Sequence, residues 1–333
     1  MSEWPHVRLH VVTGKGGTGK TTVAAALALA LASSGQQVLL CEAEGRQGIA
    51  RLFDVPPLPY EERSVALGSE GGEVHALAID PEAALLEYLD MYYHLGRAGR
   101  ALDRFGVVDF VTTIAPGLRD VLLTGKVYEA YRRRHKKDKT SVYDAIVLDA
   151  PPTGRITRFL NVNTEVAGLA KMGPIRNQAD SIMDVLRSEG TAVHLVTLLE
   201  DMPVQETLDA AEELDAIGLQ VGALIVNQLR MSPLDDDTRK ALGDQRLAAP
   251  ALVGALADAG LPGRGVAVSA EDLAEDLVTA GAEHVERLTL EAALRETVER
   301  SGRPVCTLPL LTDGVDLGAM YELAESLCAQ GLA

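Results

Sequence analysis

Short apolar runs alternate along the chain with longer stretches of helical composition. Each run is rich in Val, Ile and Leu and is followed by a polar or glycine-bearing segment, which is typical of a buried strand. We expect strands over residues 7–12, 37–41, 74–79, 142–148, 192–199, 220–226 and 304–308. We expect helices over residues 22–32, 155–160, 203–217 and 317–329, and one long helix or a helix pair over 270–300. An irregular connection is expected over the proline-rich residues 54–73. This alternation predicts an α/β fold with a doubly wound, mostly parallel sheet.

Two helical segments interrupt the alternation. One is long and apolar on more than one face, and the other is short and broken at Gly173-Pro174. We predict an α/β domain over 1–80 and 141–333, a helical insertion over 81–140 and a second short helical segment over 161–190. The apolar helices over 82–116 fit either internal packing or a groove for a partner.

The glycine-rich stretch after the first expected strand matches the phosphate-loop pattern G-x-x-x-x-G-K-[ST]. It stands between an apolar run and an alanine-rich helical stretch, as that motif requires. Glycines let backbone N–H groups approach polyphosphate oxygens, and the helix that follows directs its positive dipole end at the same charge. The residues concerned are Gly14, Lys15, Gly16, Gly17, Thr18, Gly19, Lys20, Thr21 and Thr22. We therefore predict a nucleotide-binding site that holds a polyphosphate with Mg²⁺.

Three residues of this loop have distinct expected roles. Lys20 should reach the β- and γ-phosphates, and the Thr21 hydroxyl should ligate Mg²⁺. Lys15 is not demanded by the general pattern. A cation at that position, within one chain or across a dimer, can act on the transferred phosphate as an arginine finger does.

Acidic residues follow two of the expected strands. Loop 42–48 lies at the carboxyl end of its strand, where ligands bind in open α/β sheets, and Glu44 is its candidate catalytic carboxylate. Asp149 ends another strand, where a carboxylate can hold the Mg²⁺ shell beside Thr21. It opens a second candidate switch segment made of Asp149, Pro151, Pro152, Thr153 and Gly154.

Composition limits the cellular location and the classes of partner that we expect. The net charge of −17 opposes non-specific nucleic-acid binding. The cysteines Cys41, Cys306 and Cys328 form no C-x-x-C pair, so we expect no zinc site, no iron–sulfur cluster and a cytoplasmic location. Because no signal peptide and no 18-residue apolar span is present, we expect no stable membrane insertion. The basic run 132–137 fits a solvated helix end or a docking patch for an acidic partner or anionic lipid.

Several of these stretches resemble one family. Residues 14–22 resemble the deviant Walker A loop of the arsenite-transporting ATPases, a family that includes the ATPase of tail-anchored protein targeting. Residues 149–160 resemble its second switch, D-T-A-P-T-G-H-T-L-R-F-L. Residues 226–228 are similar to its adenine-recognising strand end, and 309–311 to its loop beside the base. The likeness is closest to an actinobacterial branch of anion-transporting ATPases.

The resemblance implies an ATPase that dimerises face to face across bound nucleotide. Lys15 would reach the partner's phosphates, while Lys20, Thr21 and Asp149 would hold phosphate and Mg²⁺. The implied adenine site comprises Asn227, Pro309 and Leu310. The implied partner is a second copy or a paralogous ATPase, and the helical insertion would bind a hydrophobic client or a membrane-protein partner.

The chain also departs from the family pattern. The family's first switch, D-x-D-P-A-H, places its water-activating Asp where this chain has Glu44, whose extra methylene moves the carboxylate by about an ångström. The arsenite-binding cysteines and the C-x-x-C zinc clasp have no counterpart. The second client-binding insertion is short, and only Met91, Met172 and Met183 fall in the helical regions, although promiscuous apolar grooves are methionine-rich.

Three functions fit these observations. The first is an ATP-hydrolysing dimeric switch whose helical insertion rearranges with nucleotide state. The second is a weakly hydrolysing regulatory subunit of a heterodimer, which Glu44 motivates. The third is a membrane- or DNA-partitioning ATPase, which shares the lysine-bearing loop. The helix expected over 317–329 has two glutamates and no lysine or arginine, which disfavours membrane binding.

Overall fold

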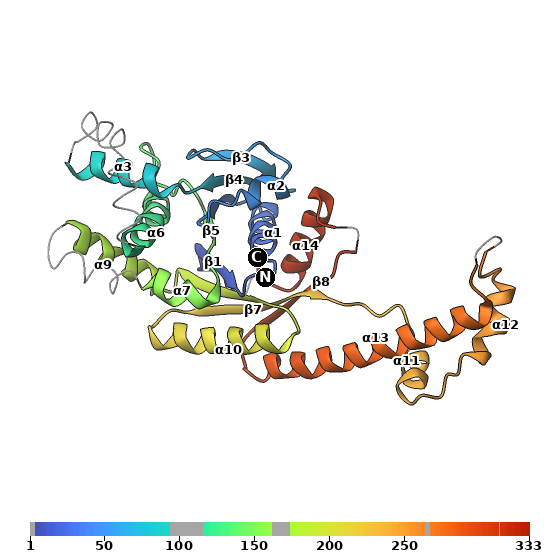
Figure 1. Ribbon diagram of the computed structural model, residues 1–333. Helices are drawn as coiled ribbons and strands as arrows, with labels where there is room; N and C mark the ends of the chain where they lie inside the picture. Colours follow the sequence, from blue (N-terminus) through green and yellow to red (C-terminus); the bar gives the residue numbers. More distant parts are fainter. Residues whose placement is uncertain (1–3, 94–115, 162–173, 264–266, 313) are drawn as a thin grey trace. The chain divides into compact units, whose positions relative to one another are not determined.

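A computed structural model describes residues 4–93, 116–161, 174–263, 267–312 and 314–333. The chain divides into two compact units (Figure 1). The first comprises Met1–Leu229 and Ser301–Ala333, and the second comprises Arg230–Arg300. The groove expected over 82–116 falls largely on 94–115, which lie outside the described residues.

An eight-stranded sheet forms the centre of the first unit, with the order β3-β4-β2-β5-β1-β6-β7-β8. Neighbouring strands run parallel except for the antiparallel pair of β3 and β4. The strands are β1 (Leu9–Gly14), β2 (Gln37–Glu42), β3 (Arg63–Leu67), β4 (Glu73–Ala78), β5 (Ala145–Asp149), β6 (Thr191–Thr197), β7 (Val221–Leu229) and β8 (Val305–Pro309). The predicted doubly wound, mostly parallel α/β fold is confirmed.

Helices cover both faces of this sheet (Figure 1). Helix α1 (Lys20–Ser33) is buried continuously from Val23 to Ala32. A helix that is apolar all round needs cover on every side, and α14 (Leu317–Ala329) packs against the side that does not face the sheet. The other helices of the unit are α2 (Gly48–Leu52), α3 (Pro81–Tyr93), α6 (Pro116–Arg132), α7 (Thr153–Leu160), α9 (Pro174–Leu186) and α10 (Asp201–Ala216).

Alternate side chains of the central strands enter two different cores. Val12 and Val147 belong to the core around α1. Leu9 and Leu148 face the other way and meet apolar residues of α6, α7 and α9. The strands are therefore buried on both faces, which explains why their sequences are continuous apolar runs.

The expectation of an irregular connection over 54–73 was wrong for part of that stretch, because β3 forms there. Its residues are mostly exposed, and it pairs on one side only, with β4. An edge strand of this kind needs no apolar run, so the hydrophobic pattern does not reveal it.

The second unit consists of α11 (Asp236–Gly243), α12 (Pro250–Asp258) and α13 (Ala270–Glu299). Ser269 and Asp272 form a capping box that starts α13. Glu291 of α13 is buried and pairs with Arg230. The sequence pattern did not separate this unit from the rest of the α/β domain. Within the described part of the chain, no helix is both long enough and apolar enough to cross a membrane.

Candidate functional site

The glycine-rich loop joins β1 to α1, and close backbone packing fixes its shape. A Cβ at Gly14 would lie 2.2 Å from the Val196 carbonyl oxygen of β6. Gly17 and Gly19 have φ values of 92° and 86°, which side-chain-bearing residues rarely adopt. The Thr18 hydroxyl donates to the Lys15 carbonyl at 2.9 Å. The turn of the loop is therefore held by contacts within the chain.

The first residues of α1 meet the end of β5. The Thr21 hydroxyl donates to Asp149 Oδ2 at 2.7 Å. Lys20, Thr21, Glu44 and Asp149 line one cavity of about 250 Å³, together with Gly17, Gly19, Glu42, Arg46 and Gly48. The structure thus brings together the three residues expected at phosphate and Mg²⁺ and the candidate carboxylate of loop 42–48. A hydroxyl beside a carboxylate is a donor set that suits Mg²⁺.

Burial dominates the electrostatics of this cavity. It raises the pKa of Asp149 to about 7, while the Thr21 hydrogen bond and the Lys20 charge act in the opposite direction. Burial also lowers the pKa of Lys20, against the attraction of Asp149 and Glu44. Each charged group is therefore held where water stabilises it poorly, which favours a ligand of complementary charge.

Glu42 is a further acidic residue of the cavity, and the sequence analysis did not single it out. It is 2% exposed and is paired in register with Asp149 across β2 and β5. Its Oε2 accepts the Ile49 amide of α2 at 3.3 Å, and its Oε1 has no hydrogen-bond partner among the described residues. The sequence signal for Glu42 is an acidic residue at the end of a buried strand.

Loop 42–48 turns sharply beside the cavity. Gly45 and Gln47 have positive φ values of 64° and 57°. Glu44 Oε2 lies 3.6 Å from Arg46 Nη2. The Gln47 side chain is fixed by Leu58, since its Oε1 accepts the Leu58 amide at 2.7 Å and its Nε2 donates to the Leu58 carbonyl at 3.0 Å.

The segment after β5 is anchored at its start and turns into α7. The Thr13 hydroxyl donates to the Pro151 carbonyl at 2.6 Å, and Pro152 is the N-cap of α7. The Thr153 hydroxyl then contacts Glu206 of α10 at 3.5 Å. Gly154, in the first turn of α7, has open space beside its Cα.

Lys15 points to α10 in this structure. Its Nζ lies 2.7 Å from Glu206 Oε1. Glu206 therefore contacts both the additional lysine of the glycine-rich loop and the first residue of α7. Among the other loop positions, Gly16 is exposed and Thr22 is half-buried in the first turn of α1.

The residues implied at the adenine are not among those that line the phosphate cavity. Asn227 Nδ2 donates to the Thr18 carbonyl at 2.9 Å, and a Cβ at Gly19 would lie 2.4 Å from the same nitrogen. The end of β7 thus packs against the glycine-rich loop. Pro309 and Leu310 follow on the next strand, where the Leu310 amide donates to the Leu229 carbonyl at 2.9 Å.

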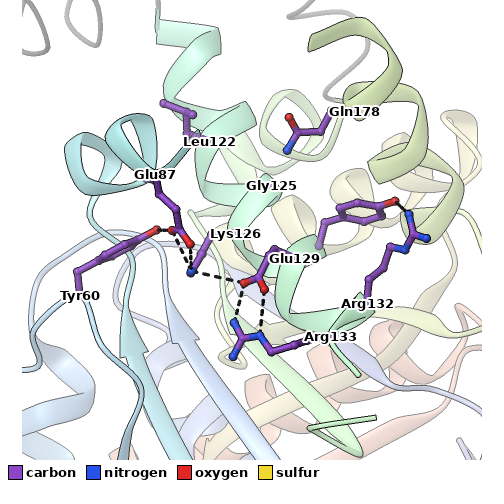
Figure 2. Close-up of a pocket in the computed structure, with 11 residues that line it drawn as sticks. Tyr60, Glu87, Leu122, Gly125, Lys126, Glu129, Arg132, Arg133 and Gln178 are labelled. Carbon is purple, nitrogen blue, oxygen red and sulfur yellow. Dashed lines mark hydrogen bonds and ion pairs between the residues drawn. The ribbon is translucent and has the colours of Figure 1, made fainter. Parts of the chain in front are cut away.

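A second cavity, of about 330 Å³, lies among α3, α6, α9 and the Tyr60 segment. Figure 2 shows a connected set of charges along its wall. Lys126 Nζ lies 2.9 Å from both carboxylate oxygens of Glu87 and 3.4 Å from Glu129. Arg133 pairs with Glu129 and with Glu62. Arg133 of the basic run is thus engaged within the chain.

Known proteins match this chain along its length. A family model described as anion-transporting ATPase matches residues 7–189. ATPase BagA of Mycobacterium tuberculosis is 53% identical over 333 residues, which cover 99% of this chain and 96% of that protein. ATPase GET3 of Kluyveromyces lactis is 25% identical, covering 68% of this chain and 73% of that protein. The arsenical pump-driving ATPase of Escherichia coli is 27% identical over 69% of this chain and 40% of its own length. The chain therefore belongs to the anion-transporting ATPase family.

Proposed function

We propose that this protein hydrolyses ATP as a dimeric switch whose helical insertion rearranges with nucleotide state. The observation that carries the proposal is the cavity in which Lys20, Thr21 and Asp149 meet beside a preformed glycine-rich loop. Loop amides and a lysine are a donor set for a polyphosphate, and a hydroxyl with a carboxylate is a ligand set for its metal ion.

Each residue has a role in this proposal. The loop amides and Lys20 would bind the phosphates, and Thr21 and Asp149 would hold Mg²⁺. When bound, this ion would neutralise charge on the phosphates. Glu44 accepts a hydrogen bond from the attacking water and orients it. Asn227, with Pro309 and Leu310, borders the adenine.

Two contact paths support coupling between the cavity and the helical insertion. Gln47 holds the Leu58 backbone, and two residues later the Tyr60 hydroxyl donates to Glu87 of α3 at 2.6 Å. From the other switch, Arg155 of α7 lies 3.7 Å from Asp120 of α6. Loss of the terminal phosphate would relax loops 42–48 and 149–154 and so move α3 and α6.

Lys15 supports the dimer part of the proposal. Its Glu206 partner is half-exposed, so the pair is weak enough to be exchanged for phosphates of a second subunit. That subunit is a second copy or a paralogous ATPase. The helical insertion would then present its surface to a hydrophobic client or a membrane-protein partner.

Nucleotide binding and turnover test the proposal. Purified protein, alone and mixed with a paralogous ATPase, is titrated with a fluorescent ATP analogue and assayed for ADP release in Mg²⁺. We expect Lys20→Ala to weaken ATP binding at least about tenfold, because a charge-assisted contact to phosphate is lost. Lys15→Ala should keep binding but lose dimerisation with a slowly hydrolysed analogue. Binding no tighter in the wild type than in Lys20→Ala contradicts the proposal.

Glu44 favours a second candidate, a regulatory subunit that binds ATP and scarcely hydrolyses it. Comparing turnover of the wild type with Glu44→Asp separates the two. A large gain supports the regulatory subunit, because the shorter carboxylate restores the position of the water. Unchanged or lower turnover favours the hydrolysing switch.

A further inference from the structure

Arg46 is a cation of the nucleotide cavity that lies outside both the glycine-rich loop and the second switch. The left-handed residues Gly45 and Gln47 flank it, and the resulting turn brings Glu44 and Arg46 to the same cavity as Lys20. Its Nη2 lies 3.6 Å from Glu44 Oε2, and its side chain is 76% exposed. The guanidinium is therefore free to move while it remains at the cavity.

The charges around the cavity favour a second protein cation there. Glu42, Glu44 and Asp149 face it, whereas Lys20 and Arg46 are the cations among its lining residues. A terminal phosphate adds negative charge beside Glu44, and like charges repel strongly where water is partly excluded. A planar guanidinium carries several fixed hydrogen-bond donors, and these can bind a phosphate oxygen in place of a carboxylate.

We propose that Arg46 is an additional ATP-contacting residue. Its guanidinium moves away from Glu44 to bind the terminal phosphate and thereby distinguishes ATP from ADP. The inference rests on the proposed function, because it requires ATP in this cavity. In this structure Arg46 lies beside Glu44. With ATP, the guanidinium donates to a terminal-phosphate oxygen, and the released Glu44 accepts a hydrogen bond from water. ADP lacks that phosphate, so Arg46 stays on Glu44.

Equilibrium binding of two nucleotides tests this exchange. Wild type, Arg46→Gln and Arg46→Lys are titrated with ADP and with the slowly hydrolysed analogue AMP-PNP, both with Mg²⁺. We expect Arg46→Gln to weaken AMP-PNP binding about tenfold, as loss of one charge-assisted hydrogen bond does, and ADP binding less than about twofold. Arg46→Lys should weaken AMP-PNP binding by an intermediate amount, since lysine keeps the positive charge but lacks the planar set of donors of the guanidinium.

Arg51→Gln is the matched control. Arg51 carries the same charge, is exposed, lies on α2 and does not line the cavity. It should leave both affinities unchanged. Equal weakening of ADP and AMP-PNP by Arg46→Gln, no weakening at all, or the same effect from Arg51→Gln overturns the inference. Wild type that binds neither nucleotide overturns the proposed function, and this inference with it.

Discussion

At the residue scale, Glu206 joins two parts of the site that the sequence places far apart. Its carboxylate lies 2.7 Å from Lys15 Nζ and accepts from the Thr153 hydroxyl at 3.5 Å. If Lys15 acts on phosphates, this pair must first break. In the proposed switch, Glu206 would therefore compete with nucleotide for Lys15.

Glu206→Gln should lower the Mg²⁺–AMP-PNP concentration needed for half-maximal dimerisation. A half-exposed ion pair contributes at most about 1 kcal/mol, which corresponds to roughly a fivefold shift. Sedimentation with AMP-PNP measures it. Glu212→Gln, an exposed residue of the same helix, is the control for the charge change alone. A shift of equal size in both variants would contradict specific competition for Lys15.

Two buried histidines form the other notable residue-scale feature. The Ala223 amide donates to His194 Nδ1 at 3.1 Å, so the His194 proton is assigned to Nε2, which faces His10 Nδ1 at 3.1 Å. The His10 proton then falls on Nε2, which has no hydrogen-bond partner among the described residues. Burial lowers the pKa of His10 to about 4 and lowers that of His194 well below its usual value. Both rings are therefore neutral in the folded protein.

Acidification should destabilise the fold through this pair. The unfolded chain takes up protons near pH 6.5, while folded His10 resists them until about pH 4, so the stability is complete above pH 6.5 and is lost as the pH falls towards 4. His10 alone accounts for roughly 3 kcal/mol over that range.

Urea unfolding of the wild type and His10→Asn between pH 7.5 and 4 measures this loss. Asn keeps an acceptor near the position of Nδ1, and the variant should show the smaller loss. Through the raised pKa of Asp149, acidification stabilises the fold. This contribution is the same in both proteins and cancels when their free energies of unfolding are compared. Parallel curves for the two proteins would contradict the assignment.

At the element scale, the hydrophobic pattern predicted the buried strands well, because strands covered on both faces must be apolar at successive positions. It missed β3, whose exposed residues need no such run. The glycine-rich loop and Asp149 were found because their chemistry is local in the sequence. Glu42 also ends a buried strand, but its position beside Asp149 follows only from the pairing of β2 with β5.

Helices α3 and α6 are joined by Lys126, whose side chain is 13% exposed. Lys126→Met should lower the free energy of unfolding by about 1–2 kcal/mol, because Glu87 and Glu129 lose a partner that water only partly replaces. Urea unfolding measures it, and Lys136→Met on the exposed basic run is the control. Equal stability of the two variants would show that the Lys126 pairs are as weak as surface ones.

At the scale of the whole molecule, the chain inserts a complete helical unit between two adjacent strands. Residues Arg230–Arg300 form their own compact unit, whereas β7 and β8 pair in the first. Sequence periodicity could not reveal this division, because it indicates where helices form and not which elements they pack against. The expected boundaries over 1–80, 81–140 and 141–333 remain a prediction about the α/β domain and its helical insertion.

Excision of 231–299 tests the independence of the first unit. Because β7 and β8 are parallel, the linker that replaces 231–299 must return from the end of β7 to the start of β8. A Gly/Ser linker of about 15 residues can span the length of one strand. We expect cooperative unfolding and Mg²⁺–ATP binding to survive. Loss of cooperative unfolding would show that the second unit is part of the same folding unit.

The anchored carbonyl of Pro151 has a mechanical consequence. Up to that residue the chain is fastened to β1, by the Ala150 amide on the Val12 carbonyl at 3.0 Å and by the Thr13 hydroxyl. Pro152 is the N-cap, and α7 begins at Thr153, two residues after Pro151. Any swing of α7 must therefore pivot on the backbone of Pro152, whose ring fixes φ and leaves ψ as the single free hinge angle. The molecule can transmit a rotation from this point while the sheet beneath it stays still.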